Sequence, residues 1–292
     1  MSDAVLLLAH GTPDSLDDME AYLTRVRGGR PPSAELVAEM RHNYSAIGGR
    51  SPLTSLTRAQ AAALAAALGG CPPVLIGMRN WKPLIADAVA EAVRGGARDL
   101  LAIPLAPQYS TLSVAKYREA LAAAVPAGVR FRLVDSWHVH PELVRAFAER
   151  VREALARGAR DAVLFTAHSL PERVVREGDP YADHVRQTAE AVAALAGLGP
   201  ARIAYQSAGR TAEPWLGPAL EEALAALAAE GVRSVLVVPV SFVCDHTEIL
   251  YDIDVAAQAA ARELGIDLAR IESLNTSPHL IDALAQLVRA HG

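Results

Sequence analysis

One phrase occurs twice in this chain, and the repeat constrains the fold more than any other feature. Residues 5–13 read VLLLAHGTP and residues 163–171 read VLFTAHSLP, so each copy is an apolar run that ends in a histidine. Such runs are typical of strands buried on both faces of a parallel sheet. Ligands bind at the carboxyl ends of these strands. We therefore expect two similar half-domains that bring His10 and His168 to one cleft.

Further apolar runs alternate with alanine-rich helical patterns. Helices are expected at residues 83–94 and 214–230, each opening with proline and ending near glycine, and the second is about one turn longer than the first. The alternation predicts an α/β protein with two Rossmann-like domains, each a parallel sheet flanked by helices, and a cleft between them. The expected strands are residues 5–9, 74–77, 100–105, 131–134, 163–166, 203–205 and 235–240.

The domain boundary is expected at residues 137–142. This gives an N-terminal domain at residues 1–138, a C-terminal domain at 139–277 and a final helix at 278–292 that packs back on the first domain. Residues 13–56 are far too many for a βα loop. We expect this stretch, called the lid insertion below, to form helices over the cleft.

Composition excludes several classes of function. The 28 Lys and Arg against 33 Asp and Glu give a net charge of −5 without a basic run, which argues against nucleic acid as a partner. The apolar stretches are shorter than the roughly 20 residues of a membrane-spanning helix, and the start of the chain lacks the features of a secretory signal. We expect a cytoplasmic protein. The two cysteines are too few for a four-cysteine iron–sulfur or zinc site.

A second group of ionisable residues follows the apolar run at 235–240, where residues 243–254 read VCDHTEILYDID. In a helix, Glu248 and Asp252 would lie at i and i+4 on one face, and a cation or a mobile proton would explain two adjacent carboxylates. The alternative is a helix start capped by Asp245, with Glu248 completing a capping box.

His168 has two possible roles as well. A neutral imidazole at a strand end binds a metal or moves a proton near neutral pH, whereas the alternative is a hydrogen-bonded packing residue. Histidine and carboxylates without thiols suit iron, cobalt or zinc. Walker A, GxGxxG, GxSxG and HExxH motifs are absent from the sequence, which disfavours nucleotide and common hydrolase chemistry.

Six ordered segments together resemble the ferrochelatase family, whose members insert ferrous iron into a porphyrin during haem synthesis. The resemblance covers nearly the whole chain. It implies that His168 and Glu248 form the catalytic and metal-binding pair on opposite walls of the cleft, with Asp252 extending an acidic route for metal or protons. Fe²⁺ is then a substrate, with no permanently bound cofactor and no iron–sulfur cluster. The segments are residues 44–53 (YSAIGGRSPL), 106–113 (APQYSTLS), 167–171 (AHSLP), 178–181 (GDPY), 206–218 (QS followed by PWLGP) and 245–254.

Within the family, the chain is similar to the short bacterial type that uses coproporphyrin III; protoporphyrin IX is the other substrate to consider. On the matching positions, Arg27, Ser51 and Tyr117 would contact porphyrin propionates, and Arg30 is a further candidate. The alternatives are solvated surface charges for the two arginines and a turn residue for Ser51.

Three positions depart from the family pattern. His10 stands where relatives commonly have a tyrosine that ligates iron from the face opposite His168, and its imidazole is expected to contact both metal and porphyrin. Asn43 replaces an arginine that would help to hold a propionate. Asn80 replaces a histidine linked to a second metal in some relatives, which puts that outer site in doubt.

Two other functions remain open. A sirohydrochlorin or cobalt-type tetrapyrrole chelatase is disfavoured by the lid insertion and the motif around Glu248. A non-catalytic haem or metal carrier is disfavoured by the intact pair of His168 and Glu248. The expected partners are porphyrin and Fe²⁺, with a transient haem-transfer partner, and the expected state is a monomer.

Overall fold

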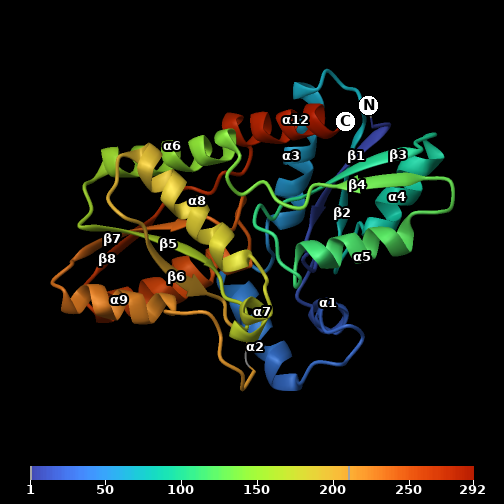
Figure 1. Cartoon of the computed structure of the whole chain (residues 1–292). Coiled ribbons are helices and arrows are strands. Elements are labelled where there is room, and N and C mark those ends of the chain that lie inside the picture. The colour runs from blue at the N-terminus through green and yellow to red at the C-terminus, as the bar shows by residue number, and fades with distance from the viewer. Residues whose placement is uncertain (1, 210) are drawn as a thin grey trace.

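The two repeated phrases lie at the centres of two parallel sheets. The computed structural model describes residues 2–209 and 211–292. The first sheet has the strand order β2-β1-β3-β4 and the second has the order β6-β5-β7-β8. Each strand therefore has a counterpart in the other sheet, and Figure 1 shows the two sheets on opposite sides of the molecule with helices packed around them. The predicted α/β class with two Rossmann-like sheets is confirmed.

Seven of the strands lie within two residues of their predicted positions. The unpredicted strand is β8, whose sequence Asp-Leu-Ala-Arg is not an apolar run; it pairs with β7 at the sheet edge. The strands are β1 (Ala4–Ala9), β2 (Val74–Met78), β3 (Asp99–Pro104), β4 (Arg130–Leu133), β5 (Ala162–His168), β6 (Arg202–Gln206), β7 (Ser234–Pro239) and β8 (Asp267–Arg270).

The helices cover both faces of the sheets, and the lid insertion forms α1, α2 and the start of α3. The helices are α1 (Met19–Val26), α2 (Ala34–Ala46), α3 (Leu53–Ala67), α4 (Ile85–Arg94), α5 (Val114–Ala124), α6 (Pro141–Arg157), α7 (Glu172–Arg176), α8 (Tyr181–Ala196), α9 (Leu220–Ala229), α10 (Thr247–Leu250), the π-helical η1 (Asp252–Ala257), α11 (Gln258–Glu263) and α12 (Pro278–His291). Within the described residues, none is long and apolar enough to cross a bilayer.

The expected helix at 214–230 is wrong at its start. Helix α9 begins only at Leu220, and it has ten residues, the same number as α4. The preceding segment runs beside the chain that follows β5 instead, where the amide of Leu216 donates to the carbonyl of Leu170 at 2.8 Å. Local sequence patterns do not reveal this pairing. It prevents the helix from starting at Pro214, where the proline had predicted its first residue.

Alternate residues of β1 face two different hydrophobic clusters. Leu6 and Leu8 pack with buried residues of α4 and α5, whereas Leu7 joins a cluster that also contains Phe165 of the second sheet. That second cluster includes residues of α3, α6, α8 and α12. One buried core therefore runs through both halves, and α12, which contacts both α3 and α6, lies across their junction in Figure 1. The boundary at residue 138 stays a prediction.

Candidate active site

The two histidines of the repeated phrase follow equivalent central strands. His10 comes directly after β1, and His168 is the last residue of β5. Gly11 permits the turn after His10, because its φ is +88° and an added Cβ would lie 2.8 Å from the backbone nitrogen of Trp81. A residue with a side chain does not fit at position 11, because the backbone of Trp81 lies too close. Glycine is therefore required between the end of β1 and the lid insertion.

His168 and Glu248 lie together, as expected for a catalytic pair, but on the same side of the molecule. The Nε2 atom of His168 is 3.9 Å from the Oε2 atom of Glu248. Both residues belong to the second half of the chain, so the expectation of opposite walls is wrong. The reason is topological: β5 and β7 are neighbours in one parallel sheet, which places their carboxyl ends at one edge. With side chains 32% and 38% exposed, the pair is open to a ligand.

His246 is a third member of this group that the set of expected site residues omitted. Its Nε2 atom lies 3.6 Å from the same oxygen of Glu248. Its Nδ1–H donates to the carbonyl of Cys244 at 3.0 Å. Desolvation would lower the pKa of His246, but the hydrogen bond and charge of Glu248 raise it. The signal was present in the sequence, because His246 stands two residues before Glu248.

Glu248 is held as an anion. Desolvation would raise its pKa, but the neighbouring His168 and His246 outweigh this effect and hold the pKa at about 2. When the imidazole of His168 is unprotonated at Nε2, its Nδ1–H donates to the carbonyl of Ser169. This bond leaves the lone pair of Nε2 on the side of Glu248, where it is available to a metal or a proton.

Asp252 differs from Glu248 in its proton affinity. Desolvation and the charge of Glu248 raise its pKa to about 6, although a hydrogen bond from Ser207 opposes the change. Ser207 has a φ of +59°, an unusual conformation for a residue with a side chain, and this conformation presents its hydroxyl to Asp252. Asp252 can therefore exchange protons near neutral pH.

The regular helix expected here is interrupted. Helix α10 ends at Leu250, and the amide of Ala256 then bonds to the carbonyl of Tyr251, one residue farther back than in an α-helix. The alternative of a cap at Asp245 is wrong. Its carboxylate accepts bonds from Arg270, Ser273 and Asn275 instead, and the N-cap position is His246.

His10 is half-buried in a site formed by the first half of the chain. Burial and the charge of Arg79 lower its pKa to about 4, so it is neutral at physiological pH. The Nδ2 amide of Asn80 lies 3.0 Å from Nε2 of His10, and the ring of Tyr22 approaches His10 edge-on at 6.3 Å. Asn80, considered above only for a second metal, is thus a direct partner of His10.

The four residues expected to bind propionates occupy different environments. Arg27 and Arg30 are exposed at the end of α1, and Nε of Arg30 donates to the carbonyl of Arg27 at 3.2 Å. Ser51 is buried and accepts from the amide of Leu53 at 3.4 Å. Tyr117 is only 5% exposed, and its burial raises the pKa to about 12. Among the described residues, neither arginine forms an ion pair, so both are available to an anionic ligand.

Two of the six recognised segments join the halves of the molecule. The carboxylate of Asp179 accepts from the hydroxyl of Ser110 at 3.0 Å and from the amide of Thr111 at 2.6 Å. Gln108 donates to Thr188 at 3.0 Å and to the carbonyl of Val240 at 3.1 Å. These buried bonds hold residues 106–113 against the second half, which is a structural role that the motif match did not reveal.

A separate hollow lies within the lid insertion. Its volume is about 410 Å³, and it contains neither His168 nor Glu248. It adjoins Ser51 along the chain, at the loop before α3. The lining residues are Asp14, Ser15, Leu16, Asp17, Gly48, Gly49 and Arg50.

Comparison with known proteins decides the family. Residues 2–292 match the family model described as Ferrochelatase. The chain belongs to the ferrochelatase family. A ferrochelatase of Deinococcus radiodurans is 45% identical, over 97% of this chain and 94% of the relative. A coproporphyrin III ferrochelatase of Anoxybacillus flavithermus is 39% identical, over 98% of this chain and 95% of the relative. The predicted class of enzyme, one that inserts iron into a porphyrin for haem synthesis, is confirmed.

Solved structures with the same fold belong to chelatases. SirB from Bacillus subtilis with Fe³⁺ has a TM-score of 0.58 at 16% identity, covering 99% of this chain and 95% of that chain. CbiX, described as the terminal enzyme of sirohaem biosynthesis in denitrifying bacteria, has a TM-score of 0.56 at 16% identity, covering 98% of each chain. At these identities the likeness establishes the fold alone.

Proposed function

We propose that this protein inserts Fe²⁺ into coproporphyrin III. The observation that carries the proposal is the pairing of Nε2 of His168 with the carboxylate of Glu248 at 3.9 Å, in a chain of the ferrochelatase family. Relatives named coproporphyrin III ferrochelatase are 37–39% identical over nearly the whole chain. This name comes from the relatives, and the substrate of this protein is our inference.

The chemistry requires an exchange of two protons for one metal ion. Fe²⁺ binds four porphyrin nitrogens, and the two pyrrole N–H groups each release a proton. The lone pair on Nε2 of His168 accepts a pyrrole proton or ligates the arriving iron. Glu248 stabilises the positive charge, and Asp252, with a pKa of about 6, passes protons toward solvent.

His10 contributes from the first half of the chain. Its pKa of about 4 keeps a nitrogen unprotonated at neutral pH, as an iron ligand requires. The amide of Asn80 now occupies the Nε2 lone pair, so this partner must turn away when His10 binds iron through Nε2. We place His10 on the porphyrin face opposite His168.

Substrate selection is assigned to the lid insertion. Coproporphyrin III carries four carboxylates, and protoporphyrin IX carries two. Arg27 and Arg30 offer planar guanidinium groups that form paired hydrogen bonds with a carboxylate. Ser51 of the lid insertion and Tyr117 of the neighbouring α5 offer hydroxyl groups. Binding energy gathered at the propionates is then available to bend the macrocycle toward the geometry that accepts metal.

A comparison of specificity constants tests the proposal. Anaerobic assays with Fe²⁺ would use coproporphyrin III, protoporphyrin IX and sirohydrochlorin. We expect the highest kcat/KM for coproporphyrin III and loss of insertion in His168→Ala, with His291→Ala at the exposed end of α12 as a matched control. Preference for protoporphyrin IX would overturn the substrate, and activity with sirohydrochlorin alone would overturn the reaction. Tight haem binding without insertion would indicate a carrier.

We further propose a cytoplasmic monomer that holds no resident cofactor and passes its product to a transient partner. Light scattering after gel filtration should give the mass of one 30.9 kDa chain. Metal analysis of the purified protein should show no iron–sulfur cluster.

A further inference from the structure

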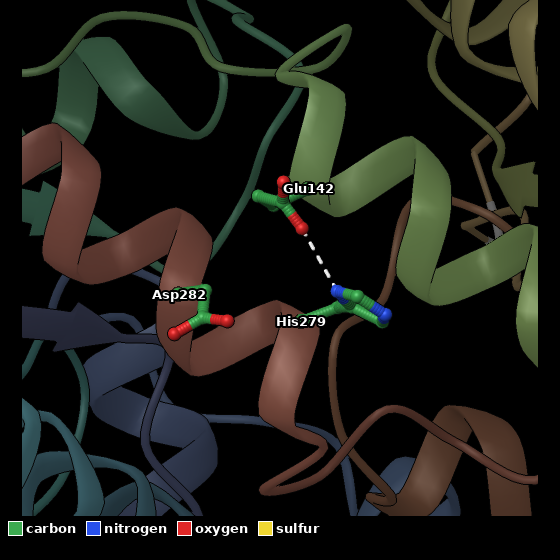
Figure 2. Close-up of side chains that lie close together, drawn as sticks. All are labelled: Glu142, His279 and Asp282. Carbon is green, nitrogen blue, oxygen red and sulfur yellow. Dashed lines mark hydrogen bonds and ion pairs between the residues drawn. The ribbon is translucent and has the colours of Figure 1, made fainter.

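A second group of metal-binding side chains lies at the contact between α6 and α12. Glu142 stands in the first turn of α6, and His279 and Asp282 stand one turn apart near the start of α12. Ligand atoms of all three residues lie within 4.8 Å of one another. Figure 2 shows Glu142 facing the two residues of α12 across the gap between the helices. None of the three belongs to the candidate active site.

The imidazole is held between carboxylates on both sides. The Nδ1 atom of His279 is 2.8 Å from Oε2 of Glu142, and its Nε2 atom is 4.0 Å from Oε2 of Glu149. The other oxygen of Glu142 accepts a hydrogen bond from Arg145 at 2.8 Å, which fixes the orientation of this carboxylate. Three carboxylates against one guanidinium leave the cluster with an excess of negative charge.

We propose that this cluster is a binding site for a divalent transition-metal ion such as Zn²⁺, distinct from the site of iron insertion. Nδ1 of His279, Oε2 of Glu142 and a carboxylate oxygen of Asp282 are the ligands, and water completes the shell. One imidazole with carboxylates is a donor set that suits Zn²⁺ and Co²⁺ better than Ca²⁺ or Mg²⁺.

The distances are compatible with this assignment. Bonds of about 2.0–2.2 Å to a tetrahedral ion place neighbouring ligand atoms about 3.3–3.6 Å apart. The separation of 2.8 Å between His279 and Glu142 needs a small opening, and the exposed side chain of Asp282 closes the remaining gap by rotation.

Glu149 and Arg145 supply the supporting contacts that metal sites require. When Nδ1 binds the ion, Nε2–H of His279 faces Glu149 at 4.0 Å, and a small movement of that side chain would complete a carboxylate–histidine–metal arrangement, which orients a ligand and raises its basicity. Arg145 supports Glu142 in the same way. The bound ion would join α6 to α12, and through α12 to α3, because α12 contacts both helices.

Zinc binding by the full chain tests the proposal. The active site also takes divalent ions, so the measurement uses a His168→Ala, Glu248→Gln background, freed of metal with EDTA. Isothermal titration with ZnCl₂ should give one site of micromolar Kd, and saturating zinc should raise Tm by several degrees. Adding His279→Ala should abolish both effects. Adding His291→Ala, which removes an exposed histidine from the same helix, should change neither.

A second variant keeps the test independent of folding defects. Asp282→Asn, at an exposed and nearly isosteric position, should weaken zinc binding at least tenfold while leaving the circular dichroism spectrum unchanged. Zinc binding that survives His279→Ala, or a background variant that binds no zinc at millimolar concentration, would overturn the proposal and leave the family assignment untouched.

Discussion

Replacing His10 with glutamine should make the protein less sensitive to acid. The pKa of His10 is lowered from 6.5 to about 4 by desolvation and by the charge of Arg79. Below pH 6.5 the unfolded chain takes up a proton at this histidine, whereas the folded chain does so only near pH 4. The unfolded state therefore binds more protons in this range, so folding stability falls as the pH decreases from 6.5 to 4.

The size of the effect follows from the difference in proton affinity. Each tenfold change is worth about 1.4 kcal/mol, and the ring of His10 is partly exposed, so we expect it to account for about 2–3 kcal/mol of the stability lost. Glutamine keeps a polar group that can bond to Asn80 but does not titrate. The variant should lose about 2–3 kcal/mol less than the wild type between pH 7 and pH 4.

Urea unfolding followed by circular dichroism at pH 7, 5.5 and 4 measures this difference. His291→Gln, at the exposed end of α12, is the control and should follow the wild type. Parallel stability profiles for His10→Gln and the wild type would refute the reasoning, because His10 would then titrate alike in folded and unfolded chains.

Four further predictions concern turnover, pH and the backbone. Glu248→Gln should lower kcat/KM by at least about 100-fold with an unchanged circular dichroism spectrum, and near-normal iron insertion would contradict its role. Wild-type turnover should rise as the pH increases through about 6, where Asp252 ionises and becomes a proton acceptor, and Asp252→Asn should lose this step in the pH–rate profile. Gly11→Ala should lower the free energy of unfolding, measured with urea, by about 1–3 kcal/mol because the position has positive φ. An unchanged free energy would contradict the requirement for glycine at this position. Arg27→Ala should raise KM for coproporphyrin III about tenfold and KM for protoporphyrin IX less, and equal effects would deny it a role in selectivity.

Much of the fold follows from hydrophobic patterning. Most of the seven strands were predictable because continuous apolar runs leave few alternatives to a strand buried on both faces, whereas β4 (Arg-Phe-Arg-Leu) alternates exposed and half-buried residues. β8 escaped prediction because a four-residue edge strand needs only one neighbour and little apolar sequence. The start of α9 at Leu220 was missed because the preceding residues pair with the chain after β5, a contact between segments about 45 residues apart that propensity rules do not describe.

The candidate site was partly predictable. Strand-end position and motif together identified His168 and Glu248, whose proximity the structure shows. Three features depend on tertiary packing and could not be predicted. They are the placement of His168 and Glu248 on the same side of the molecule, the π-helical turn at Asp252, and the contact between Asn80 and His10. Local spacing rules assume a regular helix, so they could not describe the geometry around Asp252.

The single hydrophobic core that links both sheets has a consequence for how the protein binds a flat, rigid porphyrin. Leu7 and Phe165 belong to one packed cluster, so the two strands that carry His10 and His168 are fixed to a common rigid frame. The two halves then keep a fixed spacing and do not close on each other by a hinge motion. Under the proposed function, bending of the macrocycle would depend on this fixed spacing together with α1 and α2, whose buried residues form a cluster of their own with Trp81.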